Sequence, residues 1–227
     1  AKTVTLGGTH WADTNRVMLR NRRIGCSVSG VAQFITKNGL GELKDWLEDG
    51  YDVIKEWDTK YSDWFAVPRS IKTTSVKPSG TVSLLAGATP GLHYPESRFY
   101  IRRIRLSKHS ELIEPMKKAG YKIEPAFGSE DTTSVVEVPV DVGEGIRTAS
   151  ELSIWEQFSL AAFMQRHWAD NQVSCTVTFN PETEGDEISH VLNYFQYHLK
   201  GISLLPRHDY GAYKQMPYES IDENEYK

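Results

Sequence analysis

Residues 74–87 read TSVKPSGTVSLLAG, and this stretch is the most informative part of the sequence. Its first residues favour a strand, and a Pro-Ser-Gly turn then leads into small and apolar residues that favour a helix. A turn of this kind directs main-chain N–H groups and hydroxyls at one spot, close to the positive end of a helix dipole, which predicts a phosphate site. The Gly-Lys-Ser/Thr of a Walker loop is absent from it. The alternative is an ordinary strand–helix turn that is capped by Ser79 or Thr81.

Two further blocks accompany this stretch, in order along the chain. They read NRRIGCSVSG at residues 21–30 and DNQVSCTVTF at residues 170–179, and weaker echoes lie at residues 100–105 (YIRRIR) and 203–206 (SLLP). Together with residues 73–91, they resemble the adenosylcobalamin-dependent, or class II, ribonucleotide reductases. The resemblance is closest to the monomeric type, which reduces ribonucleoside triphosphates.

The resemblance implies an α/β fold in which residues 1–227 are one C-terminal catalytic-barrel region. This region would be the second half of a ten-stranded α/β barrel of the ribonucleotide reductase type. The resemblance also implies that the Pro-Ser-Gly-Thr turn binds the phosphates of the substrate nucleotide. The residues carried over for this role, called the 78–83 turn below, are Pro78, Ser79, Gly80, Thr81, Val82 and Ser83.

The sequence also departs from the family. The family's thiyl radical forms on a cysteine in an Asn-Pro-Cys-Gly-Glu loop, which this sequence lacks, and the sequence also lacks the reducing cysteine pair of the C-terminal tail. The radical cysteine is therefore expected upstream, and no catalytic residue is assigned to this chain. The resemblance implies adenosylcobalamin as the cofactor and a ribonucleoside triphosphate as the substrate. The implied partners are the missing upstream half of the reductase and a thioredoxin-like reductant.

In an enzyme of this family the thiyl radical abstracts the 3′ hydrogen of the ribose, two thiols supply electrons, and the 2′ hydroxyl leaves as water. The share of this chain would be to position the phosphates, and we expect it to be inactive alone. Half a barrel has two unpaired edges, which another polypeptide segment is expected to cover. The alternative is a non-catalytic nucleotide-binding or folding-partner module that derives from the same barrel.

The composition narrows the class of protein. With 227 residues, the chain is one domain or a large part of one. A formal net charge of −4 argues against nucleic acid as a partner. No apolar run has the length of a signal peptide or a membrane span, so no membrane partner is expected. Two distant cysteines favour a reducing, cytoplasmic setting, and the seven scattered histidines predict no metal site.

The two cysteines have two possible interpretations. Cys26 and Cys175 each lie in a predicted buried strand, where cysteine usually acts as a small hydrophobic residue. A redox pair would require their Cα atoms to lie within about 7 Å. We expect both thiols to be reduced and unpaired.

A run of basic residues has two possible interpretations. It could contact nucleotide phosphate, or it could form a solvated strand face or an interface to another segment. Strand alternation predicts that Ile104 and Leu106 point inward and that the arginines beside them point outward. The run consists of Arg98, Arg102, Arg103, Arg105 and Lys108.

Hydrophobic periodicity predicts alternating strands and helices with mainly parallel pairing. A capping box at Ser153 and a C-cap at Gly201 are expected to bound two of the helices. Helices are expected at residues 11–19, 30–38, 41–64 with a break at Gly50, 81–88, 111–119, 153–168 and 186–200. Strands are expected at residues 2–6, 23–28 (buried on both faces), 74–76, 133–140, 173–179 and 202–205.

Overall fold

The structure is a computed structural model that describes residues 1–207 and 214–227. Its α-helices are α1 (Ala12–Asn21), α2 (Val31–Phe65), α3 (Ile113–Lys118), α4 (Ile154–His167), α5 (Pro181–Glu184), α6 (Ile188–Phe195) and α7 (Glu223–Tyr226). Its 3₁₀ helices are η1 (Lys2–Leu6), η2 (Val82–Ala86), η3 (Ala149–Glu151) and η4 (Gly185–Glu187). Its strands are β1 (Phe99–Ser107), β2 (Ile123–Pro125), β3 (Thr133–Asp141), β4 (Thr176–Phe179), β5 (Ser203–Pro206) and β6 (Tyr218–Ser220).

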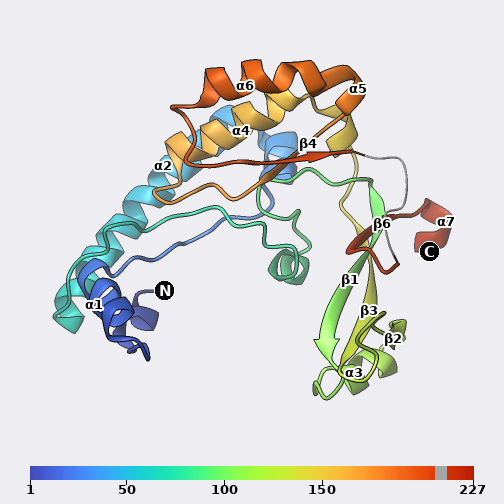
Figure 1. Cartoon of the computed structure of the whole chain (residues 1–227), viewed down its shortest axis with the longest axis horizontal. Coiled ribbons are helices and arrows are strands. Elements are labelled where there is room, and N and C mark those ends of the chain that lie inside the picture. The colour runs from blue at the N-terminus through green and yellow to red at the C-terminus, as the bar shows by residue number, and fades with distance from the viewer. Residues whose placement is uncertain (208–213) are drawn as a thin grey trace.

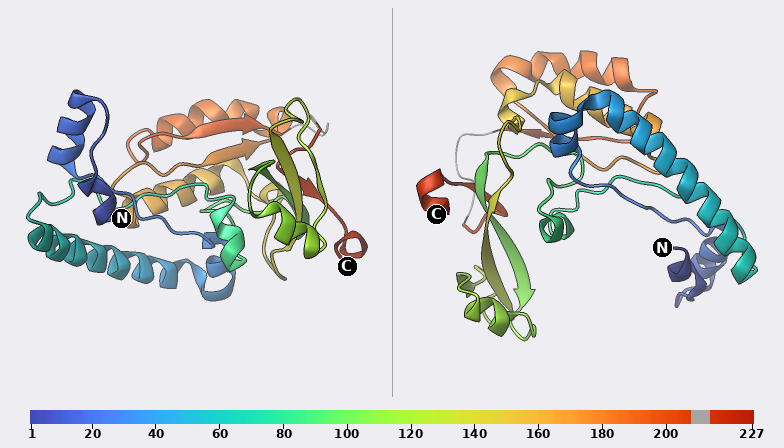
Figure 2. Two further views of the ribbon diagram at one scale, coloured as in Figure 1. Left: turned by 90° about the horizontal axis from the view of Figure 1, so that it is seen from below. Right: turned by 180° about the vertical axis from the view of Figure 1, so that it is seen from behind.

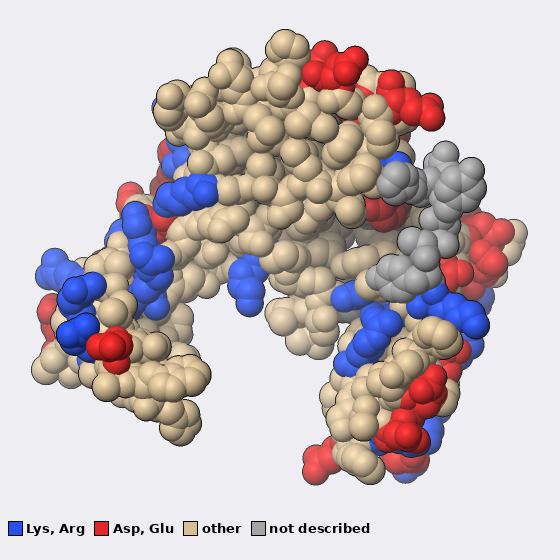
Figure 3. All heavy atoms as spheres, in the orientation of Figure 1, with Lys and Arg blue, Asp and Glu red and all other residues tan. Residues whose placement is uncertain are grey.

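These elements form an arch (Figure 1). The roof contains α4, α6, β4 and β5, and the long helix α2 descends from the roof to α1 on one side. The arm on the other side is built from β1, β2 and β3, with α3 at its tip. Figure 2 shows the same arrangement from below and from behind, and the space-filling view shows the hollow underside between the two sides (Figure 3).

Extended segments that run parallel to one another lie under the roof helices. β4 pairs in parallel with β5 along its whole length. Single parallel bridges join Val173, just before β4, to Val76, and Thr74 to Cys26. Four segments therefore lie side by side in chain order, and α2, α4 and α6 lie in the connections between them. The predicted α/β layout with parallel pairing is confirmed for this part of the chain.

A second sheet is antiparallel and has the strand order β2-β3-β1-β6. Its longest pairing joins β1 to β3, from Phe99 opposite Asp141 to Ser107 opposite Thr133. The prediction of mainly parallel pairing is therefore wrong for this region. An alternating sequence is compatible with either direction of pairing, since the direction depends on how the connection returns.

One arginine of β1 is less exposed than its predicted orientation implies. Arg103 is only 11% exposed in its side chain, and its guanidinium forms ion pairs with Glu137 of β3 and Glu219 of β6. The prediction that Arg103 faces solvent is therefore wrong. The strands on both sides of β1 supply carboxylates that neutralise the guanidinium, which makes its partial burial tolerable. Arg105 is exposed, as predicted.

The hydrophobic core lies between the parallel segments and the helices that cover them. Phe158 and Met164 of α4 are fully buried, together with Val177 of β4 and Val191 of α6. Several predicted boundaries around this core are confirmed. Ser153 forms a capping box with Glu156 at the start of α4, Gly30 is the N-cap of α2, and α2 is kinked at Gly39, which has φ 85°.

Other local predictions are wrong because of tertiary contacts. Residues 2–6 form η1 instead of a strand, since the Lys2 ammonium is buried and donates hydrogen bonds to Asp58 Oδ1 and Ser70 Oγ, each at 3.0 Å. Gly50 does not break α2, which continues to Phe65. A Cβ at this position would lie 3.4 Å from the Trp168 ring, so the glycine lets the indole pack closely against the helix.

The remaining differences concern the ends and the burial of elements. α6 ends at Phe195, so Gly201 is not its C-cap. β4 begins at Thr176, three residues later than predicted, and the predicted 23–28 strand makes only the bridge at Cys26. That segment is not buried on both faces, because Ser27 and Gly25 are exposed.

Candidate functional site

The 78–83 turn lies at the carboxyl end of the parallel segment that contains Thr74 and the fully buried Val76. It leads into η2, which lies on the hollow side of the arch between the two arms (Figure 1). Parallel α/β proteins bind their ligands at the carboxyl ends of the strands. The predicted order of a buried segment, a turn and a short helix is confirmed. η2 is a 3₁₀ helix of five residues, so its dipole is small and the turn's own groups must provide most of any attraction for an anion.

The shape of the turn is fixed by Ser79. Its φ is 52°, a left-handed conformation that is uncommon for a residue other than glycine. Its hydroxyl lies 2.6 Å from the hydroxyl of Ser29 and accepts a hydrogen bond of 3.0 Å from the Gly91 N–H. Gly91 is required here, since a Cβ on it would lie 2.4 Å from the Lys77 carbonyl oxygen. The carboxyl ends of two neighbouring parallel segments thus meet at Ser29 and Ser79.

The outer part of the turn carries groups that remain available to a ligand. Thr81 is exposed, and Val82 is 69% exposed. Within residues 1–207 and 214–227, no acceptor receives a hydrogen bond from the main-chain N–H of Gly80 or Thr81. Ser83 differs from these residues, because it is buried and its hydroxyl has no partner in the described part of the chain. The six residues that the sequence predicted for one site therefore differ in their access to a ligand: Thr81 and Val82 are exposed, whereas Ser83 is buried.

The back of the turn packs against the antiparallel sheet. Arg102 of β1 donates a hydrogen bond of 2.9 Å from Nε to the Gly80 carbonyl. Its guanidinium lies 4.5 Å from the ring centroid of Tyr218 in β6. A Cβ on Gly80 would lie 2.7 Å from the Tyr218 hydroxyl. Sequence reasoning missed Tyr218, which is far from the turn along the chain and belongs to no recognised motif.

The other members of the basic run form ion pairs or hydrogen bonds with residues of the antiparallel sheet and its loops. Arg98 pairs with Asp141, and Lys108 donates a hydrogen bond to the Glu130 carbonyl. Arg105 donates a hydrogen bond to the Gln215 carbonyl. For these residues and Arg103, the interpretation of a strand face or interface fits the structure. Within the basic run, all of which the structure describes, only Arg102 is hydrogen-bonded to the 78–83 turn.

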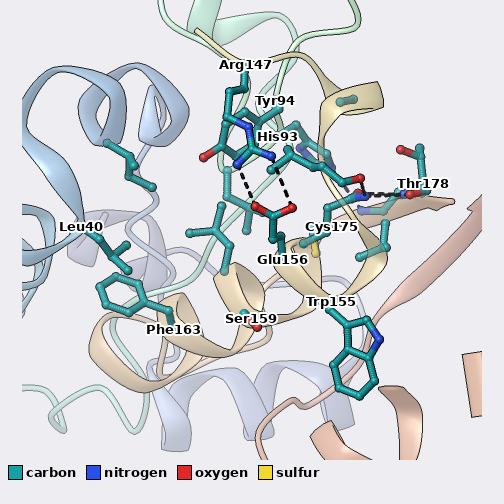
Figure 4. Close-up of a pocket in the computed structure, with 18 of the residues that line it drawn as sticks. Leu40, His93, Tyr94, Arg147, Trp155, Glu156, Ser159, Phe163, Cys175 and Thr178 are labelled. Atoms are coloured by element: carbon teal, nitrogen blue, oxygen red, sulfur yellow. Dashed lines mark hydrogen bonds and ion pairs between the residues drawn. The ribbon is translucent and has the colours of Figure 1, made fainter. Parts of the chain in front are cut away.

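A cavity of about 570 Å³ lies near the turn, between α4, β4 and the loop at residues 92–96 (Figure 4). Its walls are mainly apolar, and the Arg147–Glu156 ion pair crosses one side at 2.7 Å. The hydrogen bonds from Arg147 and from the Ser153 N–H lower the pKa of Glu156 to about 2. His93 and Tyr94 also line a smaller cavity of about 210 Å³ that reaches Pro78. The turn and the large cavity are thus linked through these two residues.

His93 binds a main-chain N–H on the edge of β4 that does not pair with β5. Its Nε2 accepts a hydrogen bond of 3.2 Å from the Thr176 N–H, and its Nδ1 lies 3.2 Å from the Pro90 carbonyl oxygen. The neutral tautomer with its proton on Nδ1 satisfies both contacts. Burial lowers the pKa of His93 below its ordinary value of 6.5, which keeps this tautomer neutral.

This depressed pKa predicts an acid-sensitive contribution to stability. As the pH falls through the ordinary value of 6.5, the unfolded chain binds a proton at His93 but the folded chain does not, so folding weakens. Between pH 7.5 and pH 5.5 the free energy of unfolding should lose up to about 1.4 kcal/mol from this group. His93→Gln, which keeps an acceptor without titrating, should lose less over the same range in urea titrations. An identical pH dependence in both proteins would contradict the role of His93.

Both cysteines are free, as predicted. Cys175 is 6% exposed, and burial raises the pKa of its thiol to about 12, so it stays protonated and behaves as a small apolar residue. Cys26 is half-buried, which corrects the prediction that it lies in a buried strand. Its segment lies at one end of the set of parallel segments, so a neighbour covers it on one edge.

No cluster of three or more potential metal ligands occurs among the residues that the structure describes. His208, one of the seven histidines, lies outside the described residues. None of the described helices combines the length and the apolar character that crossing a membrane requires.

Comparison with solved structures defines the class of protein. The chain superimposes on the crystal structure of a B12-dependent (class II) ribonucleotide reductase with a TM-score of 0.81 and 33% sequence identity. The match covers 99% of this chain and 35% of that one. No protein-family model matches the chain.

Comparison with curated proteins narrows the class. The chain is 62% identical over 228 residues to a probable adenosylcobalamin-dependent ribonucleoside-triphosphate reductase of Dictyostelium discoideum and 60% identical over 227 residues to the reductase of that name from Euglena gracilis. These matches cover 100% of this chain, but only 30% and 31% of the relatives. The chain therefore spans about a third of the length of the curated relatives it matches. The predicted resemblance is confirmed: over its whole length the chain is a homologue of one part of the adenosylcobalamin-dependent ribonucleoside-triphosphate reductases.

Proposed function

We propose that this chain is part of an adenosylcobalamin-dependent ribonucleoside-triphosphate reductase, which reduces ribonucleotides to 2′-deoxyribonucleotides in the cytoplasm. The observation that carries the proposal is the identity of 60–62% to two relatives of that name, across the full length of this chain. The share of this segment in the reaction is to hold the substrate phosphates at the 78–83 turn.

The geometry of the turn supports the phosphate role. It lies at the carboxyl ends of two neighbouring parallel segments, where Ser29 and Ser79 touch. The N–H groups of Gly80 and Thr81 have no acceptor in the described part of the chain, and the Thr81 side chain is exposed. Main-chain N–H groups and hydroxyls that converge in this way stabilise phosphate oxygens. Holding the phosphates fixes the position of the ribose, which a radical reaction at its carbons requires.

We further propose that residues 1–227 form the second half of a ten-stranded α/β barrel. The four parallel segments in chain order, with α2, α4 and α6 in the connections between them, would supply four of the five strands that half of such a barrel contains. The outer edges, at residues 23–28 and at β5, would then pair with strands of the upstream half. That half would carry the radical cysteine, and a thioredoxin-like protein would supply the electrons.

The described cavities bear on where the cofactor would bind. The cavity of about 570 Å³ near the turn has the size of a site for a drug-sized ligand. Adenosylcobalamin, a corrin with a nucleotide tail and an adenosyl group, is far larger, so this cavity does not fit it. The binding site of the cofactor would therefore lie outside this cavity.

The test is steady-state kinetics of the full-length protein with adenosylcobalamin, a dithiol reductant and a ribonucleoside triphosphate. Deoxynucleotide formation is expected. Ser79→Ala and Thr81→Ala should each raise KM about tenfold or more. Thr81→Ala removes a hydroxyl available to a phosphate, and a hydrogen bond to a charged group contributes about 1.5–3 kcal/mol. Ser79→Ala removes the contacts with Ser29 and Gly91 that shape the turn. Thr132→Ala, at an exposed threonine in the loop before β3, is the matched control and should leave KM unchanged.

Two outcomes would contradict the proposal separately. Unchanged kinetics in both turn variants would refute the phosphate assignment while leaving the reductase intact. Nucleotide binding without any deoxynucleotide product would favour the non-catalytic module.

A further inference from the structure

Among the basic residues of β1, Arg102 alone is hydrogen-bonded to the 78–83 turn. Its Nε donates a hydrogen bond of 2.9 Å to the Gly80 carbonyl, and its Nη1 donates to the main-chain carbonyls of Pro217 and Arg103 at 2.9 and 3.0 Å. All three acceptors are main-chain oxygens. Among the described residues it forms no ion pair, whereas Arg98 and Arg103 are paired with carboxylates. Its charge is therefore not neutralised by a carboxylate of the described chain.

The contact with Gly80 has a consequence for the peptide that follows. A trans peptide is planar, so the carbonyl of Gly80 and the N–H of Thr81 point in opposite directions. Because Arg102 holds the carbonyl on the side of β1, the Thr81 N–H is turned away from the antiparallel sheet. Glycine rotates freely at its backbone, so this peptide would otherwise be able to flip. The hydrogen bond from Arg102 to the Gly80 carbonyl opposes such a flip.

Tyr218 holds Arg102 in this position. Its ring lies 4.5 Å from the guanidinium, and its hydroxyl occupies the space that a Cβ on Gly80 would need, at 2.7 Å. Burial raises the pKa of Tyr218, so its phenol stays neutral beside the turn. The antiparallel sheet thus supports the 78–83 turn from behind through two side chains. Lys and Arg atoms lie on the inner side of this arm, towards the hollow (Figure 3).

We infer that Arg102, braced by Tyr218, is a positioning residue of the phosphate site: it sets the orientation of the Gly80–Thr81 peptide and leaves a positive charge beside the bound phosphates. This inference rests on the proposed phosphate role of the turn. It gives the antiparallel sheet a function in substrate binding, although no residue of that sheet is assigned to touch the nucleotide.

The test compares Arg102→Gln with Arg105→Gln in the full-length reductase. Both substitutions remove one guanidinium from β1, but Arg105 is exposed and bonds only the Gln215 carbonyl. Arg102→Gln should raise KM for the ribonucleoside triphosphate by about tenfold or more, with kcat within about twofold of the parent because the reacting atoms are untouched. Arg105→Gln should change neither constant. The KM of the parent should also rise more steeply with salt than that of Arg102→Gln, because salt screens the charge that the variant lacks.

Arg102→Lys provides a second measurement of KM, and it replaces Arg102→Gln in the test if that variant does not fold. It keeps the charge but not the planar set of donors, so KM should lie between those of the parent and Arg102→Gln. The inference would be overturned if Arg102→Gln had the same KM as Arg105→Gln. If Arg102→Gln does not fold, the same comparison is made between Arg102→Lys and Arg105→Gln. If Ser79→Ala and Thr81→Ala raise KM while the Arg102 variants do not, the inference fails and the phosphate role stands. If none of them raises KM, the phosphate role itself fails.

Discussion

Under the proposed reductase function, Gly91→Ala is expected to lower kcat/KM of the full-length protein by about 100-fold, because a misplacement of about an ångström in a binding element has effects of this size. The added Cβ would lie 2.4 Å from the Lys77 carbonyl oxygen, which is main chain and cannot move without moving the turn. The φ of Gly91 is also +54°, a conformation that costs alanine about 1–2 kcal/mol. The Gly91 N–H would then no longer meet the Ser79 hydroxyl, which shapes the 78–83 turn.

Gly87→Ala is the matched control for this prediction. Gly87 has a similar φ of +60° and follows η2, but nothing lies within 4 Å of the position that its Cβ would take. It should reproduce the backbone strain without the steric clash, so its kcat/KM should stay close to that of the parent. Equal effects of the two substitutions would show that backbone strain, and not the close approach of Gly91 to Lys77, is what the turn requires.

The second large effect is expected in stability. Phe158→Ala should lower the free energy of unfolding by about 3–5 kcal/mol, the usual range when a buried phenylalanine is truncated. Phe158 is 1% exposed in the middle of α4, and its ring centroid lies 5.6 Å from that of Phe195 in α6. The substitution removes apolar surface from the core between α4, α6 and β4, and leaves a cavity that the packed neighbours fill only in part.

Phe127→Ala makes the same chemical change at a residue that is 67% exposed. It should lower the free energy of unfolding by less than about 1 kcal/mol, since surface substitutions rarely have larger effects. Urea-induced unfolding, followed by far-UV circular dichroism, measures both proteins. A loss for Phe158→Ala no larger than that for Phe127→Ala would contradict the position of the core.

The sequence predicted the class of protein and the candidate site because both depend on local patterns. The stretch at residues 74–87 specifies a turn whose residues are neighbours in the chain, so their proximity needs no tertiary information. The same holds for the capping box at Ser153 and for the kink at Gly39, which follow from side-chain hydrogen bonds and backbone freedom within a few residues.

Three of the predictions that failed depended on contacts between distant segments. Lys2 was assigned to a strand, but a buried carboxylate 56 residues away holds its ammonium in η1. Gly50 was expected to break the helix at residues 41–64, but α2 continues through it and packs closely against the ring of Trp168. Arg103 was expected to face solvent, and two strands that flank it in space supply its counter-charges. Periodicity along one segment contains no information about which segment will pack beside it.

The sequence alone therefore determined the resemblance to the class II reductases, the α/β alternation and the 78–83 turn, since a local conformation depends on the residues that adopt it. The tertiary structure alone decided that β1 and β3 pair antiparallel and that Ser29 meets Ser79. It also decided that Arg102 and Tyr218 support the turn from behind. These contacts join residues 22 to 138 positions apart, and they arise only when burial of the common core brings their segments together.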